Sequence, residues 1–140
     1  MKPGDARPPR LPPPRESRIL YDILRALGLF FSGRLLYWRV NNGALPNATG
    51  QKVPFGLGKG APDIVGCLTR RVTVLTENGL EPRDFGCWVG LEVKRPGEEP
   101  RAAQLAWGAR LRQQGGFYAV VRSIDEARAA IERAAGGEYE

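Results

Sequence analysis

The sequence "GAPDIV", residues 60–65, places the carboxylate of Asp63 between a glycine-rich loop and the start of an apolar run. A polar residue in such a position often serves only as the turn that begins a strand. A functional role for Asp63 requires a second acidic group close to it in space. A candidate for that group lies further along the chain, in "GLEVKRPG", residues 90–97.

Glu92 and Lys94 are two positions apart in this strand-like run. Successive side chains of a strand point to opposite faces, so the two side chains share one face and their apolar neighbours point towards a core. If the run pairs with residues 63–68 as a hairpin, Asp63 and Glu92 converge. The pattern therefore predicts an acidic pair with a lysine beside it.

Two carboxylates together with a backbone carbonyl suit Mg²⁺, which keeps its remaining waters. A neighbouring lysine can hold or deprotonate the attacking water, and the metal offsets charge on a phosphate. The chain contains no histidine, and this chemistry needs none. Each motif alone is commonly structural, because E-x-K often lies on a solvated strand and P-D often forms a turn. Their combination, in this order and after a glycine-rich loop, favours an active site.

Hydrophobic periodicity predicts an α/β fold with a mixed central β-sheet flanked by helices, in the order α-β-β-β-α-β-α. Residues 1–14 are basic and proline-rich and are predicted to be a disordered tail, and residues 15–136 form one domain. Asn78-Gly79 is a turn signal, so the hairpin is expected to extend as an arm. The predicted elements are a helix at 15–29 ending near Gly28, a strand at 35–43, a loop at 44–60, strands at 63–68 and 86–96, a helix at 101–116, a strand at 117–121 and a helix at 123–135.

The chain of 140 residues has a formal net charge of +6, which permits binding to nucleic acid or to an anionic membrane. It has neither an apolar run long enough to span a membrane nor a signal peptide, so we expect a cytoplasmic protein. Cys67 and Cys87 do not form a CxxC pair and are expected to be small buried residues rather than a disulfide. A Walker A loop is excluded because Gly60 follows Lys59.

The motifs "PDI" at 62–64 and "EVK" at 92–94 resemble those of the PD-(D/E)XK nuclease superfamily. The surrounding residues are similar to the VRR-NUC domain of that superfamily, of the stand-alone phage or bacterial type. The resemblance extends over residues 16–134 and implies a restriction-endonuclease-like core. It is carried by "RVNNGA" at 39–44, "GKGAPDIVG" at 58–66, "GLEVKRPG" at 90–97, Gln104 and "GGFYAVVRSIDEA" at 115–127.

The resemblance implies a role for each candidate site residue. Asp63, Glu92 and the backbone carbonyl of Val93 would bind Mg²⁺, for which Mn²⁺ can substitute. Lys94 would be the catalytic lysine. Glu16, in the first helix, and Gln104, in the helix that follows the EVK motif, would complete the catalytic set.

The implied activity is Mg²⁺-dependent hydrolysis of DNA phosphodiesters. Some members of the family resemble junction resolvases that act as homodimers, so branched DNA such as a Holliday junction is the leading substrate. A flap or nicking nuclease acting on other DNA structures is one alternative, and a non-catalytic nucleic-acid-binding module is another.

Several basic and polar side chains are candidates for contact with DNA. Arg39 and Asn41 are expected to share a strand face, where they could bind phosphate or tie down the loop. The hairpin extension at residues 67–86 could reach DNA through its arginines, including Arg83, or could be a solvated arm. Trp107 is expected to lie in the core rather than stack on a base. The DNA-contact candidates are Arg39, Asn41, Lys52, Lys59, Arg70, Arg71 and Arg95.

Overall fold

The computed structural model describes residue 12 and residues 14–136, so the predicted tail at 1–14 lies almost wholly outside the described residues. The described chain forms three helices and six strands. Their bounds are α1 Glu16–Phe30, β1 Leu35–Arg39, β2 Gly43–Pro46, β3 Lys52–Phe55, β4 Ile64–Thr76, β5 Gly79–Val93, α2 Ala102–Gln113, β6 Phe117–Val121 and α3 Ile124–Gly136.

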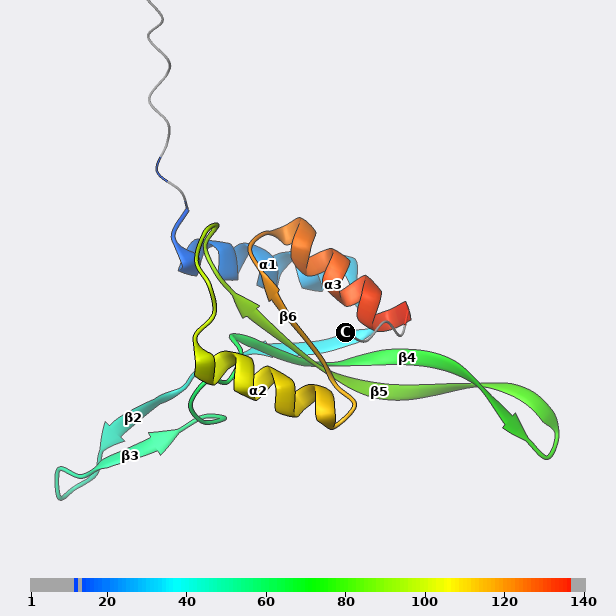
Figure 1. The fold of residues 1–140 in the computed structure, drawn as a ribbon, viewed down its shortest axis with the longest axis horizontal. Helices are drawn as coiled ribbons and strands as arrows, with labels where there is room; N and C mark the ends of the chain where they lie inside the picture. Colours follow the sequence, from blue (N-terminus) through cyan, green and yellow to red (C-terminus); the bar gives the residue numbers. More distant parts are fainter. Residues whose placement is uncertain (1–11, 13, 137–140) are drawn as a thin grey trace, which may run out of the picture.

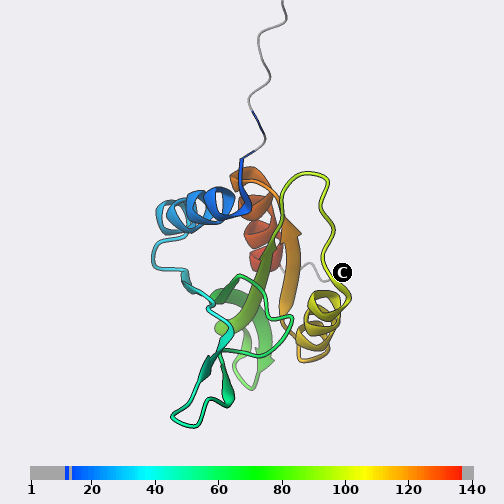
Figure 2. The ribbon, with the colours of Figure 1, turned by 90° about the vertical axis from the view of Figure 1, so that its left-hand side faces the viewer.

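Four strands form the central sheet, in the spatial order β1-β4-β5-β6. Strand β4 runs antiparallel to both of its neighbours, β1 and β5, and β6 runs parallel to β5. Helices α1 and α3 cover one face of this sheet and α2 covers the other (Figures 1 and 2). The predicted α/β class, with a mixed central sheet flanked by helices, is confirmed.

The predicted order of elements is wrong, because a second hairpin interrupts it. Strands β2 and β3 pair within the region predicted to be a loop, and they form a separate two-stranded sheet. All eight of their residues are exposed, so the burial that makes a strand visible as an apolar alternation is missing. Local hydrogen bonding closes the turn, because the side chain of Asn47 accepts from the N–H groups of Thr49 and Gln51.

Strand β1 ends at Arg39, before the predicted end at residue 43. The backbone N–H of Val40 donates to the carbonyl of Asp63 at 2.8 Å, which turns the chain away from the sheet beside the start of β4. Asn41 therefore lies outside the strand, and the prediction that it shares a strand face with Arg39 is wrong. The glycine-rich loop that follows is anchored near this point.

The core lies between the sheet and the layer of α1 and α3. Along β5, Val89, Leu91 and Val93 face this layer and are at most 2% exposed. The apolar face predicted for the first helix packs onto them, with Ile23 fully buried. Every second residue of β5 is thereby committed to the core, so the residues between them are presented to the α2 side.

The prediction that the first helix ends near Gly28 is wrong, since α1 continues to Phe30. The glycine instead makes room for a tyrosine. A Cβ at Gly28 would lie 2.8 Å from the hydroxyl of Tyr37, which donates a hydrogen bond to the carbonyl of Leu24 at 2.6 Å. Close packing of β1 against α1 explains this glycine better than a helix cap does.

The hairpin of β4 and β5 continues far beyond the core as a two-stranded arm, as predicted (Figure 1). The turn falls between the paired residues Thr76 and Gly79, where Gly79 has a φ of 101°. Cys87 is buried, Cys67 is half-buried and both are free thiols. No helix in the described part of the chain combines the length and apolar character needed to cross a membrane.

The loop between β3 and β4 packs against the backbone of α2 at Gly60. This glycine has a φ of 85°, and an added Cβ would overlap the carbonyl of Ala103 in the first turn of α2. Gly58 has a similar φ of 93°, but an added Cβ there meets no atom within 4 Å. The two glycines therefore share a backbone conformation, and only Gly60 packs against another part of the described chain.

We predict that Gly60→Ala destabilises the fold more than Gly58→Ala does. Both changes carry the cost of about 1–2 kcal/mol for a side chain at positive φ. Gly60→Ala adds about 1–3 kcal/mol for overlap with the backbone of α2. Urea unfolding of the two variants measures the difference, and equal stabilities would show that the loop does not pack closely on α2.

Candidate active site

The candidate site lies where β4 begins and β5 ends, beneath the first turn of α2. Asp63 immediately precedes β4, and the pairing of Ile64 with Leu91 brings Asp63 level with Glu92 on the neighbouring strand. Oδ2 of Asp63 accepts a hydrogen bond from the backbone N–H of Val93 at 2.8 Å. The structure thus brings together the two acids that the sequence motifs paired.

Glu92 is only 1% exposed and is held through one of its two oxygens. Its Oε1 accepts a hydrogen bond from Nε2 of Gln104 and lies 3.2 Å from Nζ of Lys94. Its Oε2 is buried without a hydrogen-bond partner among the described residues. An unpaired buried carboxylate oxygen is costly, so this atom marks a position where a cation fits.

Gln104 is the third residue of α2, and its amide is oriented by the start of its own helix. The Oε1 atom accepts from the backbone N–H of Arg101 at 2.7 Å, which leaves the amide N–H₂ group to donate to Glu92. The amide is 8% exposed and has partners at both ends. A buried glutamine on this helix, which core packing alone did not explain, is accounted for by these two contacts.

Lys94 is 6% exposed, although it carries a charged ammonium group. Its backbone N–H donates to the carbonyl of Val121 at 3.0 Å, which holds the residue at the end of the β5–β6 ladder. Glu92 supplies the ion pair that makes burial of this lysine tolerable. The positive charge of Lys94 therefore offsets negative charge of the acidic side chains from within the site.

Glu16 approaches the same site from the first turn of α1, where it is half-buried. Burial raises the pKa of its carboxyl, and Lys94 opposes that shift while the charge of Asp63 adds to it. Both groups are thus within electrostatic reach of Glu16. The predicted catalytic residues, which come from four separate elements of the chain, are gathered at one end of the sheet.

Burial is the largest influence on the pKa of Glu92. Together with the charge of Asp63, it raises the pKa of Glu92 to about 7, against the lowering effect of Lys94. Tyr118, on β6, is also buried, and its hydroxyl has no partner among the described residues. Burial and the charge of Glu92 raise the pKa of Tyr118 as well.

The donor set fits a hard divalent cation. Oε2 of Glu92 has no hydrogen-bond partner among residue 12 and residues 14–136, Asp63 has a second oxygen besides the one held by Val93, and the peptide of Val93 lies at the site. No group of three or more acidic, histidine or cysteine side chains able to hold a metal occurs among the described residues. Mg²⁺ typically uses one or two carboxylates and retains several waters, so two suffice.

A cleft of about 330 Å³ opens beside these groups and is lined by Asp63 and Gln104. Three basic residues, Arg39, Lys59 and Arg101, line the same cleft. The first turn of α2 also faces it, and the positive end of a helix dipole favours an anion. The cleft therefore joins Asp63, an acid that suits a cation, with basic groups that suit a phosphate.

The predicted DNA-contact residues lie in several separate parts of the structure. Arg39, Asn41 and Lys59 line the cleft, whereas Arg70 and Arg71 lie on the arm. Arg39 is partly engaged already, because it donates to the hydroxyl of Tyr21 at 2.9 Å and its guanidinium carbon lies 5.4 Å from that ring centroid.

Ion pairs occupy other basic candidates. On the arm, Arg71 makes a two-pronged contact with Asp84 at 2.8 and 3.0 Å, and Arg83 contacts Glu81. Arg95 lies 3.6 Å from Glu98. Lys52 is exposed on β3, outside the cleft.

The prediction that Trp107 lies in the core is wrong. Trp107 is half-buried and lines a second cavity beside the cleft. Helix α2 packs closely on β6 through Gly108, where an added Cβ would overlap the ring of Tyr118. Because a glycine makes this contact, the indole one position earlier is displaced to the edge of the helix.

Sequence analysis also missed Arg101, which lines the cleft and whose backbone orients Gln104. The predicted helix begins at Arg101, and the structure makes this residue the N-cap of α2, but the sequence prediction gave it no functional role. The available signal was Gln104 itself, since a glutamine in the first turn commonly reaches back to the backbone at the helix start.

Comparisons of the chain with protein-family models, with curated proteins and with solved structures gave no match. The resemblance to the VRR-NUC domain therefore rests on the sequence motifs alone.

We predict that Glu92 makes the stability of the metal-free protein fall as the pH rises from 4.5 to 7. An unfolded glutamate ionises near 4.5, whereas the folded group holds its proton up to about 7. In that window the unfolded state has lost the proton that the folded state keeps, so each pH unit costs about 1.4 kcal/mol. The full loss is about 3 kcal/mol.

Urea unfolding in EDTA between pH 4.5 and 8, for the wild type and Glu92→Gln, tests this sign and window. The wild type should lose stability relative to Glu92→Gln up to pH 7, and the difference should then become constant. A difference that is independent of pH, or that grows in favour of the wild type, would contradict the raised pKa.

Proposed function

We propose that this chain is a metal-dependent DNA endonuclease with a restriction-endonuclease-like core. The observation that carries the proposal is the buried Glu92, which has one oxygen held by Lys94 and Gln104 and the other without a partner in the described part of the chain. Core packing gives no reason to bury an acid, a lysine and an amide together. A site that handles a cation and a phosphate does give one.

Asp63, Glu92 and the carbonyl of Val93 would hold the divalent cation. When bound, Mg²⁺ or Mn²⁺ would supply charge neutralisation at the phosphate and lower the pKa of water. Gln104 keeps Glu92 in position through a hydrogen bond that needs no metal. Glu16 adds negative charge on the side of the site formed by α1.

Lys94 acts at the phosphate as a cation. Its Nζ forms an ion pair with Oε1 of Glu92 at 3.2 Å. An ammonium group in that position orients the attacking water and stabilises the negative charge that develops on the phosphoryl oxygens. Loss of the ammonium group therefore affects the chemical step more than it affects DNA binding.

DNA is the substrate class that fits the surroundings of the site. The net charge of +6 favours a polyanion, and Lys59 and Arg101 line the cleft together with the first turn of α2. Residues from two of the stretches that resemble a VRR-NUC domain, 39–44 and 58–66, line this cleft together with Gln104, which adds support. Cutting two strands requires two such sites, so we propose a homodimer acting on branched DNA, either a Holliday junction or a flap.

We predict that Lys94→Ala, Asp63→Asn and Glu92→Gln each lower Mg²⁺-dependent cleavage by about 100-fold or more, while DNA binding persists. Cleavage of linear, flap, splayed and four-way DNA of equal length, followed in Mg²⁺ and in EDTA, measures both activity and substrate choice. Binding of the same substrates in EDTA is measured in parallel.

Arg128→Ala is the matched control for the loss of a cation. Arg128 lies on α3, where it pairs with Glu132 at 3.0 Å and does not line the cleft. This variant should cut at the wild-type rate. A Lys94→Ala protein that keeps near-normal turnover would refute the assigned chemistry, and a wild type that binds all substrates but cuts none would establish a binding module instead.

A further inference from the structure

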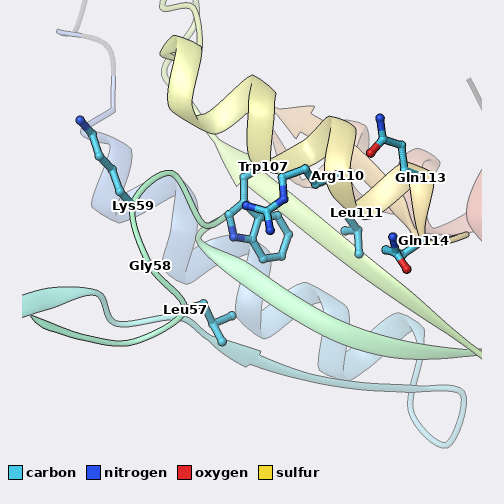
Figure 3. A pocket seen from close by; sticks show the side chains of 8 residues that line it. All are labelled: Leu57, Gly58, Lys59, Trp107, Arg110, Leu111, Gln113 and Gln114. Atoms are coloured by element: carbon cyan, nitrogen blue, oxygen red, sulfur yellow. The ribbon is translucent and has the colours of Figure 1, made fainter.

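A second cavity of about 500 Å³ lies between the β3–β4 loop and α2. Figure 3 shows the side chains of Trp107 and Arg110 extending from α2 towards the loop that carries Leu57. Leu111 lies further along the same helix and completes an apolar wall. None of the residues proposed to bind metal lines this cavity.

The lining of the cavity is aromatic, apolar and cationic. Trp107 supplies a half-buried indole, while Lys59 and Arg110 are exposed. Neither cation has an ion-pair partner in the described part of the chain, and the lining contains no carboxylate. A planar group attached to an anionic chain matches this combination of a flat apolar surface and uncompensated positive charge.

The second cavity adjoins the catalytic cleft, because Gly58 and Lys59 line both. The side chain of Lys59 extends away from the indole of Trp107 (Figure 3). A strand whose phosphate lies in the cleft can therefore place a neighbouring nucleotide in the cavity. Lys59 then stands between the two positions, where the backbone of that strand would pass.

Only a base that is not stacked in a duplex could stack on the indole of Trp107. In a duplex the faces of the bases are covered by their neighbours, whereas an unpaired nucleotide offers a free face for stacking. The second cavity also has carboxamide side chains, including Gln114, that can hydrogen-bond to the edge of a base. Its volume is within the range of small-molecule sites.

We propose that this cavity holds one unpaired nucleobase, stacked on Trp107, next to the phosphate that is cut. The proposal rests on the function proposed above and deepens it, because it specifies DNA with unpaired nucleotides at the cleavage site. It favours a flap or splayed substrate over a fully base-paired junction. Trp107 is a binding residue here, since it touches the substrate but not the reacting atoms.

The test measures binding of fluorescently labelled DNA by anisotropy, in EDTA so that nothing is cut. Three DNAs are compared: a duplex with a three-nucleotide flap, a blunt duplex with the same paired length, and the flap DNA with abasic residues in place of its unpaired nucleotides. Trp107→Ala should weaken binding to the flap by about 5- to 150-fold, as expected for one stacked base. Binding to the blunt duplex should change by less than about twofold, because no base is available to stack.

Two further variants serve as controls. Trp107→Phe keeps an aromatic face and should retain most of the preference for the flap. Leu105→Ala removes an exposed apolar side chain from the same helix, outside the lining of the cavity, and should change neither affinity. The abasic DNA tests the base contact with the wild-type protein, so this result does not depend on how a variant folds. It should bind the wild type as weakly as the flap DNA binds Trp107→Ala. Trp107→Ala should bind the abasic DNA no more weakly than it binds the flap DNA.

The outcomes separate the two proposals. Equal effects of Trp107→Ala on flap and blunt DNA, or no effect of abasic residues on the wild type, overturn the base-binding cavity. If the wild type still cuts DNA in Mg²⁺, the proposed function survives that result. A wild type that neither binds nor cuts any of the three DNAs overturns both.

Discussion

Glu92 is 1% exposed, and a buried carboxylate needs an opposite charge and hydrogen-bond donors close to it. The neighbouring residues of the site supply them. Lys94, two residues along the same strand face, supplies the opposite charge, and Gln104 supplies a hydrogen bond from another layer of the fold. These contacts satisfy Oε1 of Glu92, while Oε2 has no hydrogen-bond partner within the portion of the chain that the structure describes. A buried carboxylate oxygen without a hydrogen bond lowers the stability of the folded state. Because Glu92 gives no packing advantage in return, we propose that it is kept for cation binding.

The scaffold fixes this acid through ordinary secondary structure. The alternation of β5 commits Leu91 and Val93 to the core and so directs Glu92 towards α2. The bond between Asp63 and the backbone of Val93 holds the start of β4 against the end of β5. Gly60 lets the preceding loop approach α2 closely. As a result α2 contributes both to the acidic site, through Gln104, and to the neighbouring cavity, through Trp107.

Alternation and helical periodicity made part of this architecture predictable from sequence. They placed Glu92 and Lys94 on one strand face and gave α1 its apolar face, because burial leaves a periodic mark on the residues. The β2–β3 hairpin left no such mark, since all its residues are exposed. The exposure of Trp107 depends on how closely Gly108 approaches Tyr118, which is a property of tertiary packing. The role of Arg101 was missed although Gln104 signalled a helix start beside it, because the position of the cleft relative to that helix start is also a property of tertiary packing.

Calorimetric titration of Mg²⁺ and Mn²⁺ into the metal-free chain at pH 8 tests the central claim most directly, because Glu92 is then ionised. The wild type should bind a divalent cation at the acidic site, and Asp63→Asn and Glu92→Gln should each bind it about tenfold or more weakly. Asp84→Asn, which removes an exposed acid from the arm, should bind as the wild type does. Binding that is absent from the wild type, or that is unchanged in Asp63→Asn and Glu92→Gln, would contradict the assignment of a metal site to these two acids.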